Sequence, residues 1–141
     1  MSEKNIAIIG GAGFVGSRLT TRFRKGNVFS TKYDIDLSNQ LDKSIYLDVE
    51  DVDSLDQLAG VSTIINLAAV HRDDVRPLSR YDDVNVQGAK NVCEAACKHG
   101  VHQIIFTSSV AIYGFAPADT DESGEPNYFN DYGRTKYLAE Q

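Results

Sequence analysis

A cluster of glycines follows directly on the first apolar run of the chain. Residues 5–9 are mostly isoleucine and end at Gly10 and Gly11, which predicts a short buried strand rather than a helix. A helical pattern begins at Gly13, so the glycines occupy the turn between a strand and a helix. Two frames fit a phosphate-binding turn, Gly11-x-Gly13-x-x-Gly16 and Gly10-x-x-Gly13-x-x-Gly16. Because backbone amides at a helix N-terminus attract anions, the sequence predicts a pyrophosphate site at this loop.

The rest of the chain alternates between strand and helix patterns. The first helix is expected to end at Gly26-Asn27, with Phe14, Val15, Leu19 and Phe23 facing inward and Arg18, Arg22, Arg24 and Lys25 outward. Further strands are predicted over residues 28–34, 43–47, 61–67 and 101–107, and further helices over 51–58, 81–99 and 132–141, with a loop at 116–130. This alternation predicts an α/β fold with a Rossmann-type doubly wound parallel sheet in the order 3-2-1-4-5.

An acidic residue stands where a dinucleotide site needs one, at the end of the second predicted strand. Asp34 lies 18 residues after Gly16, close to the spacing at which a carboxylate binds the adenosine ribose hydroxyls. A carboxylate there repels a ribose phosphate, so it favours NAD over NADP. Asp36 is a competing candidate, Lys32 weakens the preference, and solvated turn carboxylates are the alternative interpretation. Weaker candidates for cofactor contacts follow the third and fourth strands: Asp48, Val49, Leu67, Ala68 and Ala69.

Hydroxyl side chains follow the fifth predicted strand, where catalytic groups of an open α/β sheet lie, and Ser109 is the candidate among them. Downstream, Tyr132 and Lys136 stand four residues apart and so share one face of a helix. An ammonium group beside a phenol favours the phenolate and lowers a pKa that starts near about 10. Taken alone, a Tyr-x-x-x-Lys spacing is more typical of an exposed helical pair, so Tyr132 and Lys136 are candidates only in combination with the other motifs.

In combination these motifs resemble the extended short-chain dehydrogenase/reductase family, in its NAD-dependent nucleotide-sugar epimerase/dehydratase branch. The resemblance covers nearly the whole chain: the glycine loop at 10–16, Asp34, residues 48–49, 66–69 and 85–92, Ser108-Ser109 and Tyr132-Gly133-Arg134-Thr135-Lys136. It fixes the glycine frame as Gly10, Gly13 and Gly16. It also implies NAD as the cofactor, with Phe14 and Val15 among the residues that bind it.

The resemblance assigns a role to each of the remaining candidates. Ser109 would hydrogen-bond the reacting hydroxyl, Tyr132 would be the general acid/base, and Lys136 would bind the nicotinamide ribose and lower the pKa of Tyr132. Asn85 resembles the structural asparagine of the family's long helix and is counted with the cofactor-binding residues.

The residues after Ser109 separate the activities within the branch. Sugar dehydratases of the family carry an Asp-Glu pair there, whereas this chain has Val110 and Ala111, which cannot transfer protons. The expected activity is therefore epimerisation of a nucleotide sugar, with a reductase second and a non-catalytic dinucleotide-binding module third.

Composition excludes several other classes of protein. The chain has 20 acidic and 14 basic side chains and a net charge of −6, which argues against a nucleic-acid-binding surface. Its apolar runs are interrupted by polar residues, and residues 1–5 lack the pattern of a secretion signal, so no membrane association is expected. Two cysteines, Cys93 and Cys97, are too few for a disulfide framework and suit the cytoplasm, and no metal site is expected.

The length of 141 residues limits the function that the chain can carry. Lys136 lies five residues before the last residue, so residues 1–141 are expected to be an NAD(P)-binding domain that is incomplete at its C-terminus, without the substrate-binding domain. The resemblance implies a UDP-sugar as the substrate and a homodimer for the full-length protein. The 141-residue chain alone is expected to bind NAD weakly and to show no turnover.

Overall fold

The computed structural model describes residues 5–38 and 43–141, which form two compact units. The first unit consists of Met1–Ala68 and Asn91–Thr107, and the second of Ala69–Lys90 and Ser108–Gln141. Residues 1–4, on which part of the secretion-signal argument rests, lie outside the described ranges. None of the helices in the described ranges is long and apolar enough to cross a bilayer.

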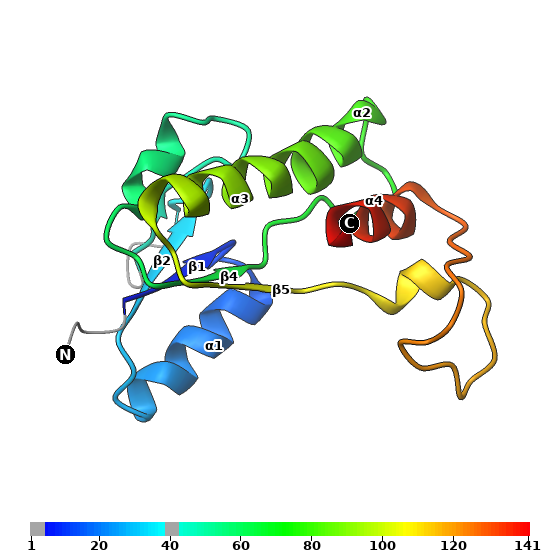
Figure 1. The fold of residues 1–141 in the computed structure, drawn as a ribbon, viewed down its shortest axis with the longest axis horizontal. Helices are drawn as coiled ribbons and strands as arrows, with labels where there is room; N and C mark the ends of the chain where they lie inside the picture. Colours follow the sequence, from blue (N-terminus) through cyan, green and yellow to red (C-terminus); the bar gives the residue numbers. More distant parts are fainter. Residues whose placement is uncertain (1–4, 39–42) are drawn as a thin grey trace. The chain divides into compact units, whose positions relative to one another are not determined.

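The first unit is built on a parallel sheet of five strands in the order β3-β2-β1-β4-β5, as the sequence predicts (Figure 1). The strands are β1 (Ile6–Ile9), β2 (Ser30–Asp34), β3 (Ile45–Tyr46), β4 (Thr63–Asn66) and β5 (Gln103–Phe106). Helix α1 (Phe14–Lys25) lies on one face, and residues 91–99 lie on the other (Figure 1). Because both faces of the central strands are covered, their isoleucines carry no polar alternation.

The core of this unit lies around the two central strands. Ile8 of β1 pairs with Ile65 of β4, and Ile9 pairs with Asn66. Ile8 and Ile64 are fully buried, and each such side chain contributes about 1.5–3 kcal/mol on removal from water. The packing places the carboxyl ends of β1, β2 and β4 at one edge of the sheet, where the candidate cofactor residues follow.

Helix α1 differs from the prediction in the face that it buries. Phe14 and Val15 are 74% and 55% exposed, so the prediction that they face inward is wrong. The buried positions are Gly16 and Thr20, one turn apart. The small residue at position 16 lets the helix approach the glycine loop closely, which rotates the side chains at positions 14 and 15 away from the sheet. The predicted end of the helix at Gly26 is confirmed.

The other predicted elements are present with shorter or altered bounds. The predicted helix 51–58 is a short 3-10 helix, η1 (Ser54–Leu58). The predicted helix 81–99 is composed of a helical turn α2 (Ser79–Tyr81), a π-helical segment η2 (Asp82–Gln87) and helix α3 (Gly88–His99), which ends before Gly100 as expected. A single-turn 3-10 helix, η3 (Val110–Tyr113), was not predicted.

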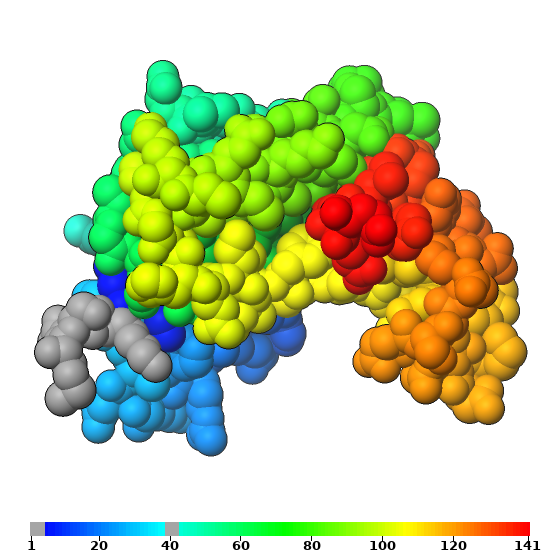
Figure 2. All heavy atoms as spheres, in the orientation of Figure 1, coloured from blue at the N-terminus to red at the C-terminus, as the bar shows by residue number. Residues whose placement is uncertain are grey.

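The second unit ends with helix α4 (Asp131–Glu140), which matches the last predicted helix. The connection 116–130 contains no helix or strand, as expected. Much of it lies on the surface, where it is coloured orange in Figure 2. A hydrogen bond that Asn127 N donates to Ile112 O at 2.8 Å brings the C-terminal part of this connection back to η3.

Candidate cofactor and catalytic site

The glycine loop is closed by backbone contacts to the neighbouring strands. The amides of Gly10 and Gly11 both donate to Tyr33 O, at 2.9 and 3.0 Å. Gly10 has a φ of +76°, a conformation that side-chain-bearing residues rarely adopt. A Cβ at this position would also lie 3.0 Å from Ala68 N. The tight turn therefore needs glycine at position 10, which favours the frame Gly10, Gly13, Gly16.

Gly16 and Gly13 differ in what requires them to be glycine. A Cβ at Gly16 would lie 2.6 Å from Gly11 Cα and 2.7 Å from Gly10 O, so the chain's own packing excludes a side chain there. A Cβ at Gly13 would meet only Gly10 O, at 3.4 Å, and the φ of −68° suits any residue. No clash within the described chain therefore requires a glycine at 13, whereas an external group approaching the backbone would.

The N-terminus of α1 fits an anionic group. Gly13 is the N-cap residue, no side chain caps this end, and no acidic residue lies in the first turn. The first-turn amides, among them those of Phe14 and Val15, have no intrahelical acceptor by the geometry of a helix. Such donors at a helix N-terminus, together with the helix dipole, suit the binding of a diphosphate.

Asp34 is joined directly to the glycine loop. Its Oδ2 accepts a hydrogen bond from Ala12 N at 2.8 Å, and its Oδ1 accepts one from Asp36 N at 2.9 Å. The carboxylate is half-buried and fixed in orientation, with lone pairs left on both oxygens. The competing candidate, Asp36, is exposed, and its Oδ1 accepts a hydrogen bond from Ser38 N. Hydrogen bonds from the side chain of Ser38 and then from its backbone hold the pKa of Asp36 below its usual value. Of the two, only Asp34 contacts the loop.

The weaker candidates after β3 and β4 also lie at this edge of the sheet. Asp48 Oδ1 accepts from Glu50 N at 2.9 Å in a local turn. Val49 is buried, and its carbonyl accepts from Asn91 Nδ2 at 2.8 Å. Leu67 N continues the ladder to Ile9 O at 2.9 Å, so Leu67 and Ala68 directly face the glycine loop. In the sequence, Asn91 is only one position of a motif. Its hydrogen bond to the Val49 backbone could be identified only in the structure.

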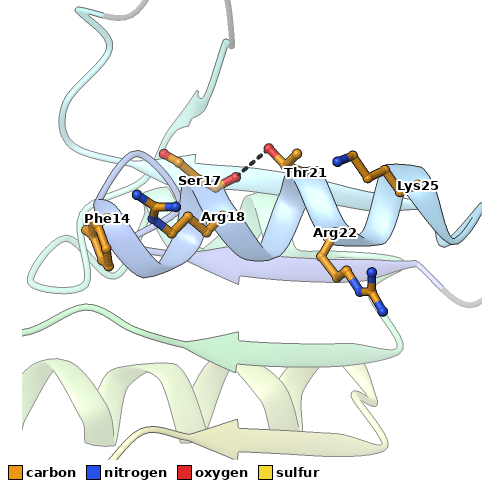
Figure 3. Close-up of a pocket in the computed structure, with 6 residues that line it drawn as sticks. All are labelled: Phe14, Ser17, Arg18, Thr21, Arg22 and Lys25. Carbon is orange, nitrogen blue, oxygen red and sulfur yellow. Dashed lines mark hydrogen bonds between the residues drawn. The ribbon is translucent and has the colours of Figure 1, made fainter.

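A surface hollow runs along α1 (Figure 3), lined by six residues of that one helix: Phe14, Ser17, Arg18, Thr21, Arg22 and Lys25. The Arg18 guanidinium lies 4.3 Å from the centroid of the Phe14 ring. Apart from Phe14, none of the predicted site residues lines this hollow, and the glycine-loop amides are not part of it. It is an open surface feature of the helix and not the pyrophosphate site.

In the second unit, Ser109 is the N-cap of η3. Its Oγ accepts a hydrogen bond from Ala111 N at 3.1 Å, which fixes the side chain and leaves its O–H free to donate. A Cβ at Gly133 would lie 2.4 Å from Ala111 O, so the first turn of α4 packs directly on η3. The structure thus joins the segment that carries Ser109 to the helix that carries Tyr132 and Lys136.

Lys136 is deeply buried and Tyr132 is half-buried. The pKa of Lys136 is lowered to about 8, because the lowering by burial outweighs the smaller raising effect of the Glu140 carboxylate. The ammonium form still predominates at neutral pH, so Lys136 supplies a positive charge in a poorly solvated position.

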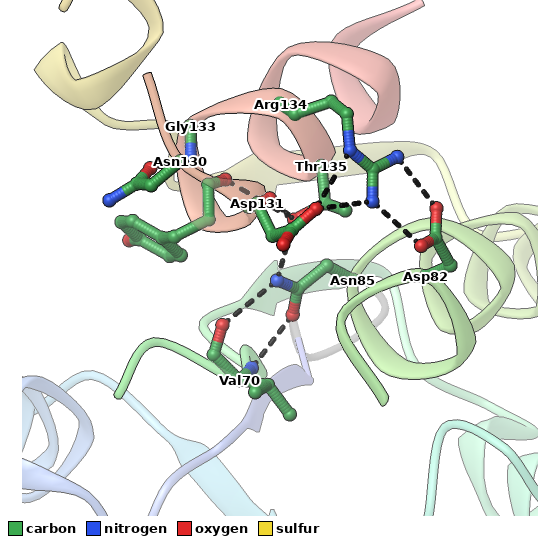
Figure 4. Close-up of polar contacts among 9 residues, drawn as sticks. Val70, Asp82, Asn85, Asn130, Asp131, Gly133, Arg134 and Thr135 are labelled. Carbon is green, nitrogen blue, oxygen red and sulfur yellow. Dashed lines mark hydrogen bonds and ion pairs between the residues drawn. The ribbon is translucent and has the colours of Figure 1, made fainter. Parts of the chain in front are cut away.

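Asn85 holds three groups together (Figure 4). Its Nδ2 donates to Val70 O at 2.9 Å and to Thr135 Oγ1 at 3.0 Å, and its Oδ1 accepts from Val70 N at 2.7 Å. Thr135 in turn donates to Asp131 O at 2.8 Å and is fully buried. Asn85 therefore fixes both α4 and the backbone next to Ala69. Thr135 stood inside the Tyr-x-x-x-Lys motif, but nothing in the spacing distinguished it.

The sequence of the chain matches the model of a known protein family. The model of the NAD dependent epimerase/dehydratase family matches residues 6–141. The chain belongs to this family. The resemblance inferred from the glycine loop, the serine and the Tyr-Lys pair is thereby confirmed.

Relatives within the epimerase/dehydratase family include several named 4-epimerases. An N-acetyl-alpha-D-glucosaminyl-diphospho-ditrans,octacis-undecaprenol 4-epimerase from Escherichia coli O157:H7 is 46% identical, over 97% of this chain and 42% of the relative. A UDP-glucose 4-epimerase from Rhizobium meliloti (strain 1021) is 29% identical, over 100% of this chain and 46% of the relative.

Solved structures agree in fold. UDP-glucose 4-epimerase from Brucella ovis in complex with NAD has a TM-score of 0.88 at 27% identity, and the match covers 97% of this chain and 46% of that one. MoeE5 in complex with UDP-glucuronic acid and NAD has a TM-score of 0.87 at 28% identity, over 96% and 47%. The chain spans less than half the length of each of these relatives.

Proposed function

We propose that the chain is the NAD-binding, N-terminal part of an epimerase that inverts a hydroxyl-bearing carbon of a diphosphate-linked sugar. The observation that carries the proposal is that Ser109, Tyr132 and Lys136 lie in one compact unit. In the other unit, Gly13 supports the proposal, because no clash within the chain requires a glycine there. The named 4-epimerases among the relatives support the same reaction.

The cofactor residues fit NAD in their chemistry. The amides of Phe14 and Val15 would hold the pyrophosphate where Gly13 leaves room for it, and the Asp34 carboxylate would accept hydrogen bonds from the adenosine ribose hydroxyls. Further contacts are proposed for Gly10 and Gly16 of the glycine loop and α1, for residues that follow β3 and β4, and for Asn85 of η2. The residues after the strands are Asp48, Val49, Leu67, Ala68 and Ala69. When bound, NAD supplies a reversible hydride acceptor.

Three side chains of the second unit would manage the proton. The Tyr132 phenolate oxygen takes the proton from the sugar hydroxyl as that carbon is oxidised, and returns it after reduction on the other face. Ser109 Oγ, held by Ala111 N, donates its hydrogen bond to the same sugar oxygen. The Lys136 ammonium, which is deeply buried, would bind the nicotinamide ribose.

The positions after Ser109 favour epimerisation over dehydration. Elimination of water needs an additional acid and base, and Val110 and Ala111 offer neither. A reductase of the same family remains the second candidate, because it uses the same three residues without the second hydride transfer.

The sugar carrier has two candidates with a diphosphate in common. The UDP-glucose 4-epimerases support a UDP-sugar. The relative at 46% identity acts, by its name, on a sugar joined through a diphosphate to undecaprenol, and the higher identity is the specific observation in favour of that carrier. A homodimer and a cytoplasmic location are further predictions that rest on the sequence resemblance.

The test uses the complete gene product with NAD and each class of sugar diphosphate. An epimerase interconverts the two epimers without net formation of NADH, whereas a reductase consumes NADH stoichiometrically. A non-catalytic binding module gives no interconversion, and its behaviour does not change on Tyr132→Phe. The absence of turnover on both UDP-sugars and polyprenyl-diphosphate sugars would overturn the proposal.

A further inference from the structure

Arg134 lies between two carboxylates on the side of α4 that faces η2 (Figure 4). Its Nη1 and Nη2 donate to the two oxygens of Asp82 at 2.9 and 2.7 Å, a bidentate pair. Its Nε and Nη2 also donate to Asp131 Oδ1 at 3.1 and 3.0 Å. The guanidinium is therefore held by four contacts from two separate segments, which leaves it little rotational freedom.

The position of Arg134 on the helix gives this contact a geometric consequence. Successive residues of an α-helix are about 100° apart, so Arg134 points about 160° away from both Tyr132 and Lys136. Arg134 therefore lies on the face of α4 opposite to Tyr132 and Lys136, and Thr135 lies next to it along the helix. The two contacts from η2, Asp82 to Arg134 and Asn85 to Thr135, come from residues three apart. Together they fix the rotation of α4 about its own axis.

The pair stays ionised across the working range of pH. Hydrogen bonds from Arg134 hold the pKa of Asp82 below its usual value, and those from Asp82 raise the pKa of Arg134 further. Yet the side chains of Arg134 and Asp82 are 30% and 46% exposed. Ion pairs with that degree of exposure usually contribute little to overall stability, so the contact is better suited to setting orientation.

We propose that Arg134 and Asp82 form a positioning pair that sets the rotation of α4 and so the placement of Tyr132 and Lys136. This inference rests on the proposed function, because the reaction of Tyr132 is what the positioning serves. Neither residue touches the sugar or NAD in the proposal; both act through the helix. Lysine cannot replace Arg134 fully, because an ammonium lacks the planar fork that binds two carboxylates at once.

The test compares variants of the complete gene product by kcat and KM. Arg134→Gln and Asp82→Asn are each expected to lower kcat about 10- to 100-fold, with KM changed less than about twofold, because misplacing a reacting group affects the chemical step. The double variant is expected to lose no more than the worse single variant, because both substitutions break the same Arg134–Asp82 contact. Arg134→Lys is expected to recover part of kcat. The matched control is Lys98→Gln, which breaks the exposed Lys98–Asp56 pair of 2.6 Å between two other helical segments.

A kcat of Arg134→Gln equal to that of the Lys98→Gln control would overturn the proposal. So would a double variant whose loss in kcat is the product of the losses in the two single variants. If the wild-type protein epimerises no sugar diphosphate, the proposed function fails instead. Hydrogen exchange of residues 131–140 then still tests the pair. Exchange at least about tenfold faster in Arg134→Gln than in Lys98→Gln supports positioning, and equal rates contradict it.

Discussion

Gly13 and Gly16 belong to one motif, but the structure predicts opposite responses to alanine. At Gly16, the added Cβ would lie 2.6 Å from Gly11 Cα and 2.7 Å from Gly10 O, both backbone atoms that cannot move independently. Such overpacking costs about 3 kcal/mol, and the better helix propensity of alanine returns about 1 kcal/mol. Gly16→Ala is therefore expected to lower the free energy of unfolding by about 2 kcal/mol.

At Gly13, the Cβ would meet only Gly10 O at 3.4 Å, and the φ of −68° is ordinary. A poorer N-cap and a less flexible unfolded chain nearly cancel, so Gly13→Ala should change the free energy of unfolding by less than about 1 kcal/mol. The added methyl group would nevertheless stand where the pyrophosphate approaches the helix N-terminus. The affinity for NAD is expected to fall at least about tenfold, which corresponds to about 1.4 kcal/mol.

The assay combines urea unfolding of each variant with calorimetric titration of NAD into the complete gene product. The expected pattern is a stable Gly13→Ala that binds NAD poorly, and a Gly16→Ala that is destabilised. The reasoning is refuted if Gly13→Ala binds NAD as tightly as the wild type, or if it loses as much stability as Gly16→Ala.

Three further predictions follow from the same geometry. The pKa of Lys136 is about 8 in the folded chain and about 10.4 when unfolded, so the unfolded state binds more protons between these two pH values. The free energy of unfolding of the wild type, relative to that of Lys136→Met, should therefore rise by about 3 kcal/mol from pH 8 to about pH 10.4. A difference between the two proteins that does not change with pH in urea titrations would contradict this. Asp34→Ala should weaken NAD more than NADP, and unchanged selectivity in a binding titration would remove Asp34 from its proposed role. Thr135→Val should cost about 1–2 kcal/mol in thermal unfolding, because Asn85 loses a buried partner; an unchanged midpoint would show that the bond is dispensable.

The sheet and its strand order were predictable because glycines and apolar runs mark the ends of the buried elements. Gly10, Gly26 and Gly100 each stand where a predicted strand or helix ends. The face of α1 was not predictable from hydrophobicity, since Phe14 and Val15 are apolar yet exposed. Their orientation depends on the close approach at Gly16, a contact between backbone segments that apolar periodicity does not show.

The candidate site was predictable as a set of residues but not as a set of contacts. The motif positions located Ser109, Tyr132 and Lys136, and the structure places them in one unit. Arg134 and Asp82, whose contact supports the site, lie 52 residues apart in the sequence, so the spacing of motifs could not identify them as partners. The π-helical segment η2, which brings Asp82 and Asn85 toward α4, also leaves no local signal in the sequence.

The central claim is that the complete protein inverts a sugar carbon by oxidation and re-reduction with the same NAD. The direct measurement follows a sugar diphosphate by NMR, starting separately from the gluco and the galacto epimer, while absorbance monitors reduced nicotinamide. We expect the same equilibrium mixture of the two epimers from either starting epimer, with no net accumulation of NADH. Conversion that stops at a stoichiometric amount of NADH, or no conversion from either epimer, would contradict it.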